Sequence, residues 1–196
     1  MAVFFCNPSA PAPRGAKAFN VTSTSKIWTK NFSPMVREPL PIQLYGHESW
    51  TVENLWQYSK KYAGQDNPQA WNEWRLAGYA KERGVRYPMG RGSAPEFSFI
   101  TKSLGKMGLV QARKQIYIPA YIQKLQRFCW KEVEMLVSEI LAGDIWIWDF
   151  DVTSQHAGSW EDIVNDETRP MGHGFVLIHW IEQLLGRPLI ERNGDG

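Results

Sequence analysis

Apolar and polar residues alternate with two different periods along the chain, and this predicts both helices and strands. In several long segments apolar residues recur at the spacing of an amphipathic helix. The predicted helices are residues 53–63, 68–83, 109–128, 131–142 and 175–185. Alternation typical of strands is found at residues 41–46, expected to belong to an antiparallel pair, and at residues 144–152. The pattern indicates an α+β fold, mostly helical, with a small antiparallel sheet.

Capping residues and helix breakers set the ends of these helices. Thr51 precedes the first helix as its N-cap, and Glu53 lies in the first turn, where an acidic side chain interacts favourably with the helix dipole. Gly64 is expected to end this helix. Pro68 suits the first turn of the second helix. Pro119 lies inside the third helical segment, so we expect a kink or break just before it.

The chain is expected to form a single domain with an irregular extension at its N-terminus. Residues 1–30 make up this extension, in which residues 7–18 are rich in proline, alanine and glycine. The β-branched residues at 19–25 indicate one short strand within it. Residues 31–190 contain the other predicted elements and form the expected domain, in which residues 155–172 are predicted to be a loop or lid.

Composition limits the classes to which this protein can belong. The chain has 22 lysines and arginines and 20 acidic residues, so its net charge of +2 gives no argument for nucleic-acid binding. Cys6 and Cys129 fit neither a metal site nor a disulfide framework, which indicates a reducing compartment. No segment approaches the ~20 apolar residues that a membrane span requires. We therefore expect a soluble, cytoplasmic protein with no membrane contact.

Polar residues gather on one side of the first predicted helix. Glu53, Gln57 and Lys60 are spaced i, i+4 and i+7, so they line up along a helix. Two interpretations are open, namely a solvated face with ion pairs, or a binding or catalytic site. The ten tryptophans leave a similar choice, because indole rings such as those of Trp50 and Trp56 fill cores and also stack on bases or sugars.

The residues before and within this helix resemble those of a known family. Asn31-Phe32-Ser33-Pro34 is followed by Pro41-Ile42, Trp50-Thr51-Val52-Glu53-Asn54, Gln57, Lys60 and Tyr62. This order resembles the NADAR superfamily, which has N-F-x-P and then W-x-[ST]-x-E-H-x-x-Q-x-x-K-[FY]. Weaker matches follow at Met89-Gly90-Arg91, Asp149, Asp151, Gly172 and Gly174. The chain departs from the family pattern at Asn54, where a histidine is usual.

The resemblance implies an NADAR-like fold and an N-glycosidase activity. Members of the family cleave the bond between a base or amine and a ribose phosphate, as in a pyrimidine precursor of riboflavin, and some remove ADP-ribose from modified guanine. For this chain the resemblance implies a hydrolase with Glu53, Lys60 and Asp151 as catalytic residues. The Glu53 carboxylate would stabilise positive charge on the ribose or activate water. The Lys60 amine would stabilise a phosphate or hydroxyl, or form a Schiff base with the opened sugar.

The other expected site residues would bind the substrate. Gln57 would orient a hydroxyl, Arg91 would hold a phosphate, and Asp149 would bind ribose hydroxyls. The predicted substrate-binding residues are Asn31, Phe32, Trp50, Asn54, Gln57, Arg91, Asp149 and His173. The expected ligand is a ribose phosphate or an ADP-ribose-type molecule, or ADP-ribosylated nucleic acid or protein. Neither a metal nor a cofactor is expected, and the sequence does not indicate an oligomeric state.

Two alternative functions are open at this point. The chain could be a binding module that holds ADP-ribose or a nucleotide without cleaving it, an interpretation prompted by Asn54. It could also be a factor that processes a modified nucleic-acid base, with the aromatic, lysine and arginine residues of segment 113–127 as a stacking platform. The net charge of +2 argues against a large nucleic-acid footprint.

Overall fold

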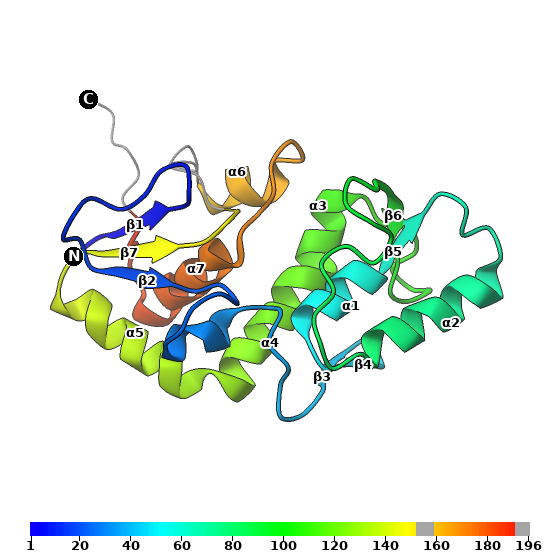
Figure 1. Cartoon of the computed structure of the whole chain (residues 1–196), viewed down its shortest axis with the longest axis horizontal. Coiled ribbons are helices and arrows are strands. Elements are labelled where there is room, and N and C mark those ends of the chain that lie inside the picture. The colour runs from blue at the N-terminus through cyan, green and yellow to red at the C-terminus, as the bar shows by residue number, and fades with distance from the viewer. Residues whose placement is uncertain (152–158, 191–196) are drawn as a thin grey trace. The chain divides into compact units, whose positions relative to one another are not determined.

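The computed structural model describes residues 1–151 and 159–190, and the chain divides into two compact units (Figure 1). The first unit is discontinuous in sequence and comprises Met1–Ser33 and Leu125–Gly196. The second unit is the continuous segment Pro34–Lys124. Residues 1–30, which the sequence suggests are an irregular extension, therefore belong to a folded unit together with the C-terminal part of the chain.

The first unit contains a parallel sheet with the strand order β1–β7–β2. β1 (Val3–Cys6) and β2 (Ala18–Asn20) pair with opposite edges of β7 (Ile145–Trp148). β7 confirms the strand predicted within residues 144–152, and β2 overlaps the strand predicted at 19–25. The sequence did not reveal β1, because a strand buried in a parallel sheet forms an apolar run without regular alternation.

Helices complete the first unit. They are the 3₁₀-helix η1 (Trp28–Phe32), α5 (Trp130–Ala142), α6 (Trp160–Asn165) and α7 (His173–Leu185). α5 and α7 confirm two of the predicted helices, and α5 ends at Gly143 as expected. The ring of Phe175 in α7 packs on the ring of Phe5 in β1, with centroids 4.3 Å apart. This contact joins α7 to the sheet, beside which it lies in Figure 1.

Helix α6 lies in the segment that the sequence suggests is a loop or lid. Ser159 and Asp162 form a capping box, in which Asp162 N donates to Ser159 Oγ at 3.2 Å and Ser159 N donates to Asp162 Oδ2 at 2.9 Å. The helix is only six residues long, too short to show the apolar periodicity that predicts a helix. Residues 155–158 of the predicted loop lie outside the described residues.

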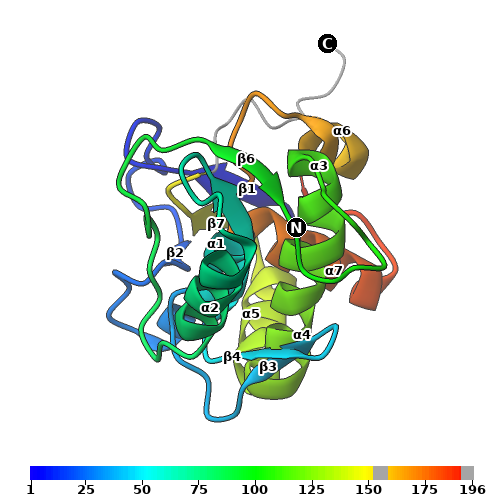
Figure 2. The ribbon, with the colours of Figure 1, turned by 90° about the vertical axis from the view of Figure 1, so that its right-hand side faces the viewer.

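The second unit contains two antiparallel strand pairs. β3 (Ile42–Leu44) pairs with β4 (His47–Ser49), and β5 (Lys60–Tyr62) pairs with β6 (Pro95–Ser98). Figure 2 shows β3 and β4 as neighbouring strands. The β3–β4 pair confirms the antiparallel strand predicted at residues 41–46. With the helices of both units, these pairs confirm the α+β class, while the parallel sheet is an addition that the sequence did not indicate.

The helices of the second unit follow in chain order. They are α1 (Val52–Tyr58), α2 (Pro68–Tyr79), α3 (Leu109–Ala112), the π-helical turn η2 (Arg113–Tyr117) and α4 (Ile118–Phe128), whose last residues belong to the first unit. α1 and α2 lie side by side in Figures 1 and 2. Gly78 permits their close approach, because a Cβ atom there would lie 1.9 Å from the Tyr58 ring. Within the described residues, none of the helices has the length and apolar character needed to span a membrane.

The expected helix ends require two corrections. α1 ends at Tyr58 instead of continuing to Gly64, because the backbone turns at Ser59 and Lys60 then pairs with Ser98 of β6. α2 ends at Tyr79 rather than near Gly84. The break expected before Pro119 is present as η2, since proline has no N–H to donate to the carbonyl four residues earlier.

Candidate functional site

The N-terminus of α1 holds Glu53 in a fixed position. The Thr51 hydroxyl caps the helix by accepting a hydrogen bond from Asn54 N at 3.0 Å. Glu53 N donates to Pro34 O at 3.0 Å, which ties the start of the helix to the preceding segment. Glu53 is only 7 % exposed and Gln57 only 9 %. The polar line on α1 is therefore buried, and this excludes the interpretation of a solvated helix face.

Glu53, Gln57 and Lys60 form a continuous hydrogen-bonded cluster, hereafter the Glu53–Gln57–Lys60 cluster. Gln57 Nε2 donates to Glu53 Oε1 at 2.8 Å, and Lys60 Nζ donates to Gln57 Oε1 at 2.9 Å. The carboxylate only accepts and the amine donates, so these two neighbours determine which way the amide faces. Lys60 belongs to β5 and not to the helix, but its long side chain still reaches back to Gln57.

Burial lowers the pKa of the Lys60 amine to about 8. The charge of Glu53 acts against this shift, whereas the charge of Arg113 adds to it. With a pKa of about 8, about a tenth of the amine is neutral at pH 7, against about one part in three thousand for an ordinary lysine. A neutral amine with a free electron pair is the form that attacks carbon.

Tyr62 and Arg113 belong to the surroundings of this cluster. The sequence placed Tyr62 only in the family pattern and Arg113 only in the segment considered as a stacking platform. Burial raises the pKa of Tyr62 to about 12, and the nearby Glu53 and Tyr58 contribute. Tyr62 thus keeps its proton at neutral pH and can act as a hydrogen-bond donor. The apolar pattern pointed to neither residue as part of this site, because residues 60–62 follow a helical pattern and become a strand only by pairing with β6.

Asn54 has a structural task that differs from the expected substrate binding. Its Nδ2 donates to Lys81 O at 2.8 Å and to Arg83 O at 3.0 Å, and its Oδ1 accepts from Val85 N at 2.8 Å. The residue is fully buried. Because both ends of the amide are occupied by backbone groups, Asn54 holds the segment after α2 against α1.

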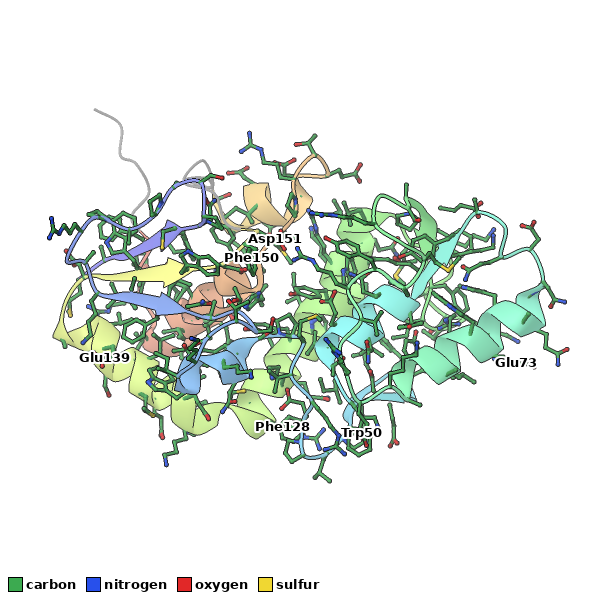
Figure 3. All side chains as sticks on the ribbon, viewed as in Figure 1. Trp50, Glu73, Phe128, Glu139, Phe150 and Asp151 are labelled. Atoms are coloured by element: carbon green, nitrogen blue, oxygen red, sulfur yellow. The ribbon has the colours of Figure 1, made fainter. Side chains whose placement is uncertain are left out.

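Trp50 and Arg91 lie in the second unit but have other neighbours. The Arg37 guanidinium is 4.1 Å from the centroid of the Trp50 ring, and Figure 3 marks the position of Trp50. Arg91 is exposed in a loop between Gly90 and Gly92, and its guanidinium is 6.0 Å from the Tyr87 ring. Among the described contacts, none joins Trp50 or Arg91 to Glu53, Gln57 or Lys60.

Asp149 and His173 are brought together at the carboxyl end of β7. Asp149 Oδ2 lies 3.1 Å from His173 Nδ1 and accepts from Gly174 N at 2.9 Å, so it also caps α7. His173 Nε2 is 2.8 Å from Val21 O. Both ring nitrogens therefore lie within hydrogen-bond distance of an oxygen atom. Both side chains are buried, and they link β7, α7 and the segment after β2.

The remaining predicted residues of the first unit are spread over several elements. Asn31 Nδ2 donates to Glu132 Oε1 at 2.7 Å, and Phe32 is fully buried beside Trp28. Asp151 is partly buried just beyond β7, where Figure 3 labels it next to Phe150. Asp149 and His173 thus form a pair in the first unit. Among the described contacts, none joins Asp151 to this pair.

The segment expected to be a nucleic-acid platform is largely core. Arg113, Tyr117, Tyr121 and Lys124 are all buried, and Lys124 forms an ion pair with Glu38, which is also buried. Bases cannot stack on rings that the protein interior already covers. Segment 113–127 is therefore not the platform that the sequence suggested, because its aromatic residues follow the apolar face of a helix.

Comparison with known proteins assigns the chain to a family. The model of a family described as "Family of unknown function (DUF6939)" matches residues 10–177. The chain belongs to DUF6939. No curated protein and no solved structure matches it. For this DUF6939 protein, a function has to be argued from the chemistry of its own residues.

In the Glu53–Gln57–Lys60 cluster of this DUF6939 protein, a partly neutral amine and a carboxylate both form hydrogen bonds to the side-chain amide of Gln57. Such a pair can supply a nucleophile and a base in one place. The Asp149–His173 pair offers less, because its polar atoms are engaged with each other and with the backbone. The Glu53–Gln57–Lys60 cluster is therefore the candidate site.

Proposed function

We propose that this protein is an N-glycosidase that cleaves the bond between a base or amine and a ribose, in a ribosylated nucleotide-like or ADP-ribosylated substrate. The observation that carries the proposal is the buried amine of Lys60, with its pKa lowered to about 8 and its hydrogen bond through Gln57 to Glu53. The order of residues that resembles the NADAR superfamily supports the same reaction. We further propose a cytoplasmic location, which the reduced state of Cys6 and Cys129 supports.

Cleavage of this bond creates positive charge on the ribose. The negative charge of Glu53 would stabilise that charge, and this lowers the barrier to departure of the base with the bonding electron pair. The neutral Lys60 amine would then bond to the anomeric carbon and lose a proton, which the departing base takes up. Opening of the ring C–O bond, with the remaining N–H proton passing to the ring oxygen, would give a Schiff base. Water would hydrolyse this imine to the free sugar, and its two protons would pass to the Lys60 nitrogen, the first by way of Glu53, as the C–N bond breaks.

Gln57 would hold the two reactive groups in fixed positions. Its amide donates to the Glu53 carboxylate and accepts from the Lys60 amine. In the proposed reaction these two hydrogen bonds would keep the carboxylate and the amine at opposite ends of one amide group.

The direct test is turnover of a substrate panel. NAD, ADP-ribose conjugates and ribosylaminopyrimidine phosphates would be incubated with the protein, and the released base would be quantified by chromatography. We expect release from at least one class, with a loss of about a hundredfold or more in Glu53→Gln and in Lys60→Met. Lys61→Met is the matched control, because its side chain faces the other side of β5 and pairs with Glu96.

Trapping distinguishes the Schiff-base route from simple hydrolysis. Borohydride added during turnover would fix the sugar covalently on Lys60, and mass spectrometry would locate it. Release of base without a trapped adduct would overturn the nucleophilic role of Lys60 but leave Glu53 as the catalytic carboxylate. Tight binding of ADP-ribose with no product from any substrate would overturn the hydrolase proposal in favour of a binding module.

A further inference from the structure

The turn that carries Arg113 has unusual geometry. Between α3 and α4, Ile118 N donates to Arg113 O, five residues earlier, instead of to the residue four earlier as in an α-helix. A single π-helical turn of this kind widens the helix and is frequently found at functional sites. Pro119 follows at once and cannot donate to the backbone. The widened turn therefore changes which side chains the helix presents on each side.

One aromatic contact joins this turn to the candidate site. The rings of Tyr117 and Trp56 meet edge to face, with centroids 5.4 Å apart. On the α1 side, Lys60 Nζ lies 4.3 Å from the centroid of the same Trp56 ring. Arg113 precedes Tyr117 by about one turn, and it is only 3 % exposed. The turn thus brings a buried guanidinium into the surroundings of the Lys60 amine.

A guanidinium is charged at every physiological pH, so its effect on a nearby amine is permanent. In a buried environment a positive charge disfavours a second one, and it acts more strongly than it would in water. The charges of Arg113 and Glu53 have opposite effects on the pKa of Lys60. The protonation state of the amine therefore depends on the balance between these two residues.

We propose that Arg113 is a positioning residue of the Glu53–Gln57–Lys60 cluster, which increases the fraction of the Lys60 amine that is neutral and nucleophilic. The catalytic importance of this role rests on the proposed function, but the electrostatic role itself does not. The negative charge of Glu53 raises the pKa of Lys60 and so acts against the effect of Arg113. The substrate-free protein should therefore already contain a lysine of unusual reactivity at position 60.

The test measures that reactivity without a substrate. The intact protein is exposed to a small amount of acetic anhydride at a series of pH values, and mass spectrometry reports the acetylation rate of Lys60. Arg113→Met removes the charge and keeps an apolar stem, while Arg113→Lys keeps the charge. Lys114→Met is the matched control, because this neighbour in the same turn is exposed. Glu53→Gln removes the opposing charge.

We expect Arg113→Met to slow acetylation of Lys60 at pH 7 by about threefold or more, which corresponds to a rise of about half a pKa unit. Arg113→Lys should stay within about twofold of the natural protein, and Lys114→Met should match it. Glu53→Gln should accelerate acetylation. An unchanged pH profile in Arg113→Met, with an intact circular dichroism spectrum, would overturn the proposal.

Two safeguards keep the result interpretable. If Arg113→Met does not fold, Arg113→Gln replaces it and the same profile is expected, since glutamine keeps polar contacts but has no charge. A shifted profile in a protein that releases no base would support the role of Arg113 while refuting the proposed function. Base release with a trapped adduct on Lys60, but an unshifted profile in Arg113→Met, would refute only the role of Arg113.

Discussion

Replacing Lys60 by methionine should change the stability of the protein in a pH-dependent way. The folded protein holds this amine with a pKa of about 8, against the ordinary lysine pKa of 10.5 in the unfolded chain. Between these values the unfolded chain binds more protons than the folded one, so the free energy of unfolding rises with pH. The shift of about 2.5 units corresponds to about 3 kcal/mol, gained as pH rises from about 8 to about 10.5.

The Lys60→Met variant lacks this titration. Below pH 8 the substitution removes a buried positive charge, which favours the folded state. It also removes the hydrogen-bond donor to Gln57 Oε1, which lowers the free energy of unfolding by about 1–3 kcal/mol. We therefore expect the variant to be as stable as the natural protein or more stable at pH 7. At pH 10 it should be the less stable of the two, because the natural protein then holds a neutral amine that still donates to Gln57.

Urea unfolding at matched pH values, followed by tryptophan fluorescence, measures this difference directly. The stability difference between Lys60→Met and the natural protein should change by about 2–3 kcal/mol from pH 7 to pH 10. Lys61→Met should show no comparable trend. A difference that stays constant with pH would refute the reasoning, because it would mean that Lys60 titrates alike in the folded and unfolded states.

Three further substitutions test the packing around the two units. Gly78→Ala should lower the stability by about 1–3 kcal/mol in urea unfolding, because its Cβ would overlap the Tyr58 ring. Asn54→Ala should cost about 3 kcal/mol by calorimetry and increase proteolysis of residues 81–85, whose backbone groups lose their partners. Asp149→Asn should destabilise the fold by about 3 kcal/mol in urea unfolding, since it removes the buried carboxylate that contacts His173 and accepts from Gly174 N. A stability equal to that of the natural protein would contradict this role of the carboxylate.

Local signals predicted the local elements well. Thr51, Pro68 and Gly143 marked helix ends correctly, because each acts through the few residues beside it. The parallel sheet escaped prediction, since β1 pairs with a strand about 140 residues away and no local pattern encodes that pairing. Residues 59–62 continued a helical pattern, and only the partner strand β6 makes them extended.

The candidate site was partly predictable for a related reason. Glu53 and Gln57 lie one turn apart on a real helix, so their spacing carried structural information. Lys60 was assigned to the wrong element, yet the length of its side chain brings the amine to Gln57 in either case. Arg113 could not be found from sequence, because a single arginine in an amphipathic helix gives no sign of a π-helical turn.

The chain order of the sheet has a consequence for synthesis on the ribosome. β1 and β2 both pair with β7 and not with each other, so the strands made first have no partner until residue 148 has emerged. Residues 34–124 form a continuous unit, which can fold before β7 is available to pair with β1 and β2. The Glu53–Gln57–Lys60 cluster lies within this segment and can therefore form early, whereas the sheet that joins the two ends of the chain closes last.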